Sequence, residues 1–168
     1  MTNASPRTPI DPRGPRFGAA ITAVLLLVAV GLALIGGTPA ALTERLVQPA
    51  FLLFAFIVLV FAWGAFAGVG RHPYGWLYRR LVRPRLGAPA ELENPVPPTF
   101  AQGIGLVVTA VGLLLFLVGV PYALVVTGSL AFIAAFLNSV FDYCVGCQIY
   151  LLLVRTGVLG RRTTPVAP

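Results

Sequence analysis

The sequence predicts an all-α membrane protein, with four transmembrane helices arranged as two parallel-repeat helical hairpins and short interfacial helices after the second and fourth spans. Hydrophobic residues make up 58% of the chain and charged residues 10%, against about 45–50% and about 25% in soluble proteins. Four apolar stretches lack a formal charge over about 20 residues each, which is the length of a membrane-spanning helix. The two halves of the chain also resemble each other.

The four predicted spans are Phe17–Gly37, Pro49–Val69, Phe100–Gly119 and Tyr122–Phe141. Their apolar residues run continuously instead of alternating with polar ones, which excludes the strands of a β-barrel. The first span has an alternative interpretation as a signal peptide, because small residues suited to cleavage occupy positions 36–40. Its apolar core is longer than the roughly 7–15 residues of such a peptide, so we expect a retained span.

The arginines predict the orientation of the chain. All 12 basic residues are arginine, and 11 of them lie on one predicted side of the membrane. These are Arg7, Arg13, Arg16, Arg71, Arg79, Arg80, Arg83, Arg85, Arg155, Arg161 and Arg162. Because positive flanks resist translocation, we expect a multi-pass protein of the bacterial inner (plasma) membrane with both termini and the central loop in the cytoplasm. Only Arg45 breaks the pattern, and a +7 charge that follows the membrane sides so closely does not indicate nucleic-acid binding.

Self-comparison indicates two copies of one hairpin. Pro15–Ile21 opens the first span with the same pattern as Pro98–Ile104 at the third, and Pro49 and Tyr78 recur 72 residues later as Pro121 and Tyr150. Both copies enter from the same side, so the repeats are parallel. Chance similarity between apolar helices is the alternative. The predicted parts are an N-terminal tail 1–16, a transmembrane domain 17–158 with repeat one 15–86, linker 87–97 and repeat two 98–158, and a C-terminal tail 159–168.

Each even-numbered span is followed by a segment that mixes arginine with aromatic and aliphatic residues, Tyr74–Leu86 and Gln148–Leu159. Such segments are typical of helices in the headgroup layer. A straight continuation of the fourth span would make a helix about 50 Å long, so we expect a break near Gly146. Polar residues within the spans are expected to hydrogen-bond between helices. These are Thr109, Thr127, Asn138 and Ser139.

The only two cysteines form a Cys-x-x-Cys motif, Cys144 and Cys147, where the last span ends. A helix N-terminus favours the thiolate form. This favours Cys144 as the nucleophile and Cys147 as the resolving thiol. Asp142 opposes a second negative charge and is a candidate proton relay. The repeat register sets His72 opposite the cysteines, as a candidate neighbour.

Other interpretations of the dithiol stay open. Zinc could use Cys144, Cys147, His72 and Asp142 as ligands, or two cysteines from each half of a homodimer. The cysteines could also be buried and inert. A purely structural disulfide is disfavoured because the cytoplasm keeps thiols reduced. The sequence predicts no bound cofactor, and a quinone enters only as an alternative electron acceptor.

Four motifs together resemble a bacterial membrane family catalogued as domain of unknown function 4395 (DUF4395). The resemblance covers roughly residues 10–158 and is most specific at the cysteine motif. It implies no established activity. It does imply an actinobacterial setting and genes near those of thioredoxin-like proteins and sulfurtransferases. The motifs are Ile10–Phe17, His72–Tyr78, Pro98–Gln102 and Cys144–Tyr150.

Three functions are consistent with these features. In the leading hypothesis, Cys144 and Cys147 cycle between dithiol and disulfide, or carry a persulfide, in exchange with a soluble thioredoxin-like or sulfur-transfer partner at the membrane. In the second, the chain is a subunit of a transporter for a small sulfur species, which would need a homo-oligomer because four helices enclose little volume. In the third, it is a non-catalytic membrane scaffold. Whether the protein is an enzyme is left open.

Overall fold

The computed structural model describes residues 8–89 and 91–159. Its four long helices are α1 (Arg13–Gly36), α3 (Pro49–Ala67), α5 (Val96–Leu117) and α6 (Ala123–Phe141), and all four are long and apolar enough to cross a membrane. Even a helix of 19 residues reaches about 29 Å, close to the hydrocarbon thickness. The described part of the chain holds no β-strand, only an isolated bridge between Ile10 and Glu93. The predicted all-α membrane protein is confirmed.

The helices begin and end a few residues away from the predicted positions. α1 and α5 each start four residues early, at Arg13 and Val96. The early start of α5 takes Pro97 and Pro98 into the first helical turn, where a missing N–H costs nothing. α3 stops at Ala67 because Gly68 adopts a positive φ of 83°. The predicted contributions of Arg7, Arg161, Arg162 and most of the C-terminal tail lie outside the described residues.

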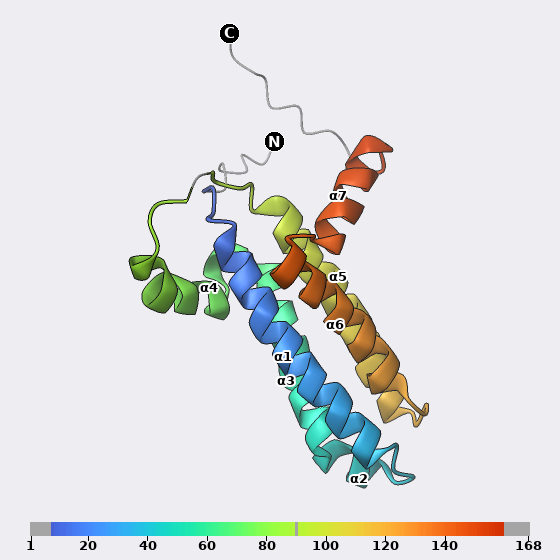
Figure 1. The fold of residues 1–168 in the computed structure, drawn as a ribbon. Coiled ribbons are helices and arrows are strands. Elements are labelled where there is room, and N and C mark those ends of the chain that lie inside the picture. Colours follow the sequence, from blue (N-terminus) through green and yellow to red (C-terminus); the bar gives the residue numbers. More distant parts are fainter. Residues whose placement is uncertain (1–7, 90, 160–168) are drawn as a thin grey trace.

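Short helices occupy the two ends of the bundle. At one end, α2 (Leu42–Val47) joins α1 to α3, an element for which the sequence carried no signal. At the other end, η1 (Val69–Arg71), α4 (Pro73–Leu77), a π-helical turn η2 (Tyr78–Val82) and η3 (Arg83–Arg85) follow α3, and α7 (Val145–Arg155) follows α6. Figure 1 shows α4 and α7 at the end where α1 begins, opposite α2. The predicted interfacial segments are therefore helical.

The predicted break between the last span and α7 lies at residues 142–144. Asp142 adopts a left-handed conformation with φ 57°, and the Tyr143 N–H donates to the Leu137 carbonyl at 3.2 Å, which ends α6. Gly146 instead lies in the first turn of α7. It is required for packing, because a Cβ there would come within 2.5 Å of the Ala101 Cβ on α5.

The tertiary contacts follow the predicted repeat. α1 packs against α3, α4 and α6, and α5 correspondingly packs against α6, α7 and α3. The aromatic contacts repeat as well. Phe17 on α1 lies 5.9 Å from Tyr78 between ring centroids, and Phe100 on α5 lies 5.5 Å from Tyr150. Equivalent positions of the two halves thus hold η2 and α7 against the first helix of their own repeat.

The core is narrow and apolar, as expected for helices that meet lipid on their outer sides. Its largest fully buried side chains are Leu26, Phe54, Ile57, Phe116, Leu124 and Thr109. The hydroxyls of Thr109 and Thr127 donate to carbonyls one turn back in their own helices, at 2.7 and 2.8 Å, and Ser139 does so at 3.0 Å. The expectation that these hydroxyls bond between helices was therefore wrong. A hydroxyl reaches its own helix's carbonyl without any tertiary alignment.

Candidate functional site: the α7 dithiol and the α4 cavity

Cys144 and Cys147 are joined by a disulfide at the start of α7. Their Cα atoms lie 5.2 Å apart, within the range of about 4.4–6.8 Å that an unstrained bridge requires. Both residues are half-buried. The bridge closes a short loop, because the two cysteines are only three positions apart in the sequence.

Cys144 is the N-cap residue of α7. Its backbone is extended, and its sulfur accepts a hydrogen bond from the Cys147 N–H at 3.2 Å. The first N–H groups of an α-helix have no partner within the helix and carry part of the positive end of the helix dipole. When the pair is reduced, these groups favour negative charge on the Cys144 sulfur over the Cys147 sulfur, which lies deeper in the helix.

Asp142 forms an ion pair with Arg16 at 3.1 Å, so the start of α1 is connected to the junction before Cys144. Both side chains are exposed, and such surface pairs contribute at most about 1 kcal/mol. The ion pair therefore adds little to the free energy of folding, and its main effect is to connect the α6–α7 junction to α1. The negative charge of Asp142 also contributes, after burial, to raising the pKa of Glu93 above its ordinary value.

His72 occupies the position in repeat one that Cys144 occupies in repeat two. It is the N-cap residue of α4, and its Nδ1 accepts a hydrogen bond from the Tyr74 N–H at 3.2 Å. Figure 1 shows α4 and α7 on different sides of the bundle, against α1 and α5 respectively. No group of three or more His, Cys, Asp and Glu side chains arranged for a metal ion occurs within residues 8–89 and 91–159. The structure thus places His72 in a different site from the dithiol.

The imidazole of His72 is deeply buried, with 6% of the residue exposed. Burial lowers the pKa of His72 below its ordinary value of 6.5, and the Val60 carbonyl opposes this shift to a smaller extent. The ring is therefore neutral at pH 7. Because Nδ1 accepts a hydrogen bond, the proton lies on Nε2. The Val60 carbonyl of α3 faces this imidazole as an acceptor, although the contact falls short of full hydrogen-bond geometry at Nε2.

A cavity of about 780 Å³ lies beside His72. Its walls come from residues 8–22, from the end of α3 through η2 and η3, and from residues 92–102 at the start of α5. The cysteines of α7 do not line it. Polar side chains from all three parts of the wall face the cavity. They include Thr22, His72, Arg79, Arg83, Thr99 and Gln102.

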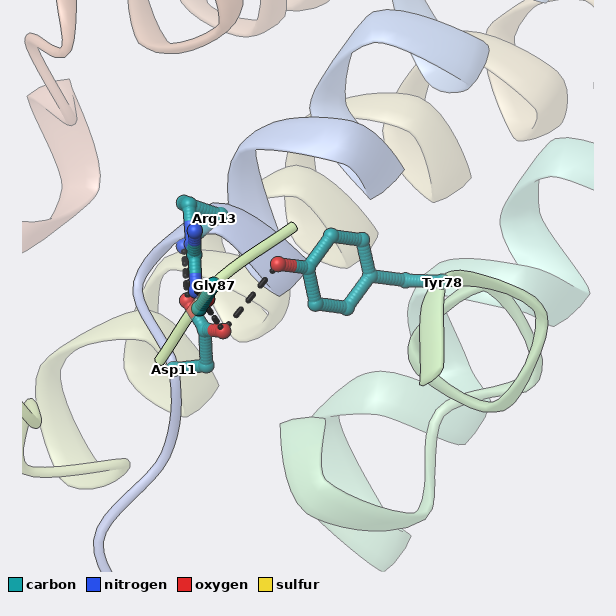
Figure 2. A network of polar contacts seen from close by, with 4 residues as sticks. All are labelled: Asp11, Arg13, Tyr78 and Gly87. Atoms are coloured by element: carbon teal, nitrogen blue, oxygen red, sulfur yellow. Dashed lines mark hydrogen bonds and ion pairs between the residues drawn. The ribbon is translucent and has the colours of Figure 1, made fainter. Parts of the chain in front are cut away.

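Figure 2 shows a network of polar contacts around Asp11. Asp11 and Tyr78 of this network line the cavity. The Asp11 carboxylate accepts hydrogen bonds from the Arg13 side chain at 2.9 and 3.0 Å and from the Tyr78 hydroxyl at 3.0 Å. Arg13 also donates to the Gly87 carbonyl at 3.0 Å. The Arg13 hydrogen bond is the main cause that lowers the pKa of Asp11 below its ordinary value of 3.8. The network joins the chain before α1 to η2 and to the linker.

Comparison with known proteins identifies the family of this chain. The chain matches the family described as Domain of unknown function (DUF4395) over residues 10–155. The chain belongs to this family. The matched region of the DUF4395 chain runs from the segment that contains Asp11 to the end of α7 and includes His72 and both cysteines. No curated protein and no solved structure matches the chain.

Sequence reasoning found the DUF4395 dithiol but missed the cavity. His72 was identified through its register with Cys144 and through the His72–Tyr78 motif, and the arginines of the central loop through their bearing on orientation and on the headgroup layer. None of these signals predicted a shared cavity. Asp11 and Gln102 had a signal, since both lie in motifs shared with the family, but no pattern connected them. Residues that line one cavity from three separate segments leave no periodicity in the sequence.

Proposed function

We propose that this DUF4395 protein is a membrane-bound thiol–disulfide exchange component, in which Cys144 is the nucleophile and Cys147 the resolving thiol. The observation that carries the proposal is the disulfide at the N-terminus of α7, with Cys144 as the N-cap and both residues half-buried. This combination of a close pair, a helix N-terminus and partial exposure is what a reactive dithiol requires. An inert pair would need none of the three.

The exchange proceeds in two displacements. The Cys144 thiolate attacks one sulfur of a partner's disulfide, forms a mixed disulfide and releases the partner's other sulfur as a thiolate, which takes up a proton. The Cys147 thiolate then attacks the Cys144 sulfur, closes the Cys144–Cys147 disulfide and releases the second partner thiolate. Two electrons pass to the partner and its disulfide becomes a dithiol. The reverse sequence oxidises the partner by the same steps.

The proposed partner is a soluble thioredoxin-like or sulfur-transfer protein on the cytoplasmic side. A dithiol at one end of the bundle can exchange only with groups on that side, since a single pair cannot pass electrons across about 30 Å of hydrocarbon. Exposed arginines of the segment after α3, Arg79 and Arg80 among them, would attract an acidic partner to the same end. With a sulfurtransferase, the Cys144 thiolate would accept the terminal sulfur of the donor's persulfide, and the donor would leave as a thiolate.

A trapping experiment tests the assignment of the two roles. The reduced full chain in detergent is mixed with a thioredoxin that keeps one cysteine, activated as its thionitrobenzoate mixed disulfide. Cys147→Ser should form a stable one-to-one adduct with thioredoxin, because no resolving thiol remains, whereas wild type should release thioredoxin. Cys144→Ser is the matched control and should react about tenfold more slowly. The adduct is followed on non-reducing gels.

Two results would contradict the proposal. If neither single variant reacts after reduction, the pair is inert and exchange is excluded. If the two variants react at equal rates, Cys144 has no advantage and the assignment of nucleophile and resolving thiol is wrong. A scaffold would retain thioredoxin in a pull-down equally well when both cysteines are replaced by serine, which is a third measurable outcome against exchange.

A further inference from the structure

The cavity beside α4 carries a net positive charge. Three arginines line it, Arg71, Arg79 and Arg83, against a single acid, Asp11. The Asp11 carboxylate is already neutralised by Arg13, which lies outside the lining. A cavity with this balance favours an anionic occupant.

Two arginine side chains in the cavity wall keep donors available. Within the residues that the structure describes, no hydrogen bond or ion pair engages the guanidinium of Arg83, while Arg79 donates one N–H to the Gly70 carbonyl at 3.1 Å. Both side chains are exposed. An acceptor-rich, negatively charged group in the cavity would give these guanidinium groups a partner.

The position of the cavity relates it to the membrane surface. The only two tryptophans of the chain flank it, Trp63 near the end of α3 and Trp76 on α4, and they are 57% and 53% exposed. The Trp63 indole donates to the Arg71 carbonyl at 3.1 Å, and the Arg80 guanidinium lies 5.4 Å from the centre of the Trp76 ring. Exposed tryptophans with arginines beside them are typical of the headgroup level of a bilayer. The cavity wall also includes the apolar residues Phe66 and Val69.

We infer that this cavity binds the phosphate group of an anionic phospholipid, with Arg79 and Arg83 donating to the phosphate oxygens. The planar guanidinium fork matches phosphate geometry, and its charge makes each hydrogen bond stronger than a neutral one. The apolar part of the wall would lie against the glycerol and the first carbons of the acyl chains. The site is separate from Cys144 and Cys147 and does not depend on their chemistry.

Thermal unfolding of the purified full chain in maltoside detergent tests the site. The probes are dihexanoyl phosphatidylglycerol, dihexanoyl phosphatidylcholine and inorganic phosphate, and the readout is tryptophan fluorescence. Phosphatidylglycerol should raise the midpoint of unfolding in a saturable manner, and phosphatidylcholine should not. Arg83→Gln should raise the half-saturating concentration about tenfold, because one charged interaction is lost.

Arg85→Gln is the matched control, since Arg85 belongs to the same segment but does not line the cavity. It should leave the half-saturating concentration unchanged, and so should replacing both cysteines by serine. Unfolding without lipid establishes that each variant is folded. Protection by inorganic phosphate alone, with the same dependence on Arg83, would identify free phosphate as the source of the bound group and overturn the lipid assignment. Equal protection by phosphatidylcholine, or equal losses in Arg83→Gln and Arg85→Gln, would overturn the site.

Discussion

Two N-cap residues show how the halves of this molecule differ. His72 and Cys144 each begin a short helix after a span, and each accepts a backbone N–H through its side chain. The same local geometry yields a neutral, buried imidazole in one repeat and a half-buried sulfur in the other. The hairpin fold is therefore the same in both repeats, and the residue type at the N-cap decides the chemistry of each repeat.

The buried imidazole makes the stability of the protein depend on pH. Because the pKa of His72 is lowered in the folded state, the unfolded chain takes up this proton first as the pH falls below about 6.5, and stability is lost. The slope cannot exceed about 1.4 kcal/mol per pH unit. His72→Asn keeps an N-cap acceptor and should show a smaller loss of unfolding midpoint between pH 7.5 and about 5.5, measured by thermal unfolding in detergent. An identical pH dependence in wild type and variant would contradict the buried, neutral assignment.

At the scale of elements, α4 and α7 pack against their neighbouring spans at equivalent positions. In one repeat the glycine lies on the span, and in the other it lies on the short helix. On α1, Gly18 receives the side chain of Tyr74, whereas on α5 the methyl of Ala101 lies against Gly146 of α7. A small residue is present on one side of each contact, but on opposite sides. This allows α7 to approach α5 closely at the turn that lies between the two cysteines, so the docking of α7 controls how the dithiol is presented.

Replacing Gly146 by alanine should loosen that docking. The added methyl would lie 2.5 Å from the Ala101 Cβ, and such overpacking costs about 1–3 kcal/mol. We expect a lower unfolding midpoint and faster alkylation of the reduced cysteines by maleimide. Gly103→Ala on α5 is the matched control because nothing lies within 4 Å of its added methyl, so both quantities should stay near the wild-type values. Equal effects of the two substitutions would show that α7 is not held through Gly146.

At the scale of the whole molecule, the arginine at the α2 end has a structural role. Arg45 donates to the carbonyls of Pro39 at 2.6 Å, Ala40 at 2.7 Å and Leu117 at 2.8 Å. It therefore joins the α1–α2 connection to the C-terminal end of α5, where carbonyls lack helical partners and the helix dipole favours a cation. Arg45 is the one arginine outside the predicted cytoplasmic segments, and its positive charge is used to bind the carbonyls at this end of the bundle.

The orientation predicted from the arginines can be measured by cysteine labelling in intact cells. A single cysteine at the exposed position Thr43 on α2, with Cys144 and Cys147 replaced by serine, should react with a membrane-impermeant maleimide. Cys144 in the Cys147→Ser variant is the matched probe at the other end and should react only after permeabilisation. The reverse pattern would place the dithiol outside the cell and remove the proposed cytoplasmic partner.

Much of the fold could be predicted because lipid imposes its requirements on each segment separately. A span needs about 20 apolar residues whatever its neighbours are, so the four long helices were predicted to within a few residues. The bias of the arginines and the Cys-x-x-Cys spacing are equally local. The exact helix ends were less predictable, because prolines at Val96–Pro98 and a left-handed Asp142 decide them through backbone geometry.

The amino-acid sequence alone is enough to predict the number of spans, the repeated hairpin and the pair of cysteines near one end. Each of these features follows from a short stretch of chain. The folded arrangement alone separates His72 from the dithiol, pairs Arg16 with Asp142, and brings Asp11 to Tyr78 and Arg13 to Gly87 beside a cavity. These contacts join residues far apart in the chain. They depend on which helix packs against which, and a uniformly apolar helix surface carries no sequence pattern that specifies its neighbour.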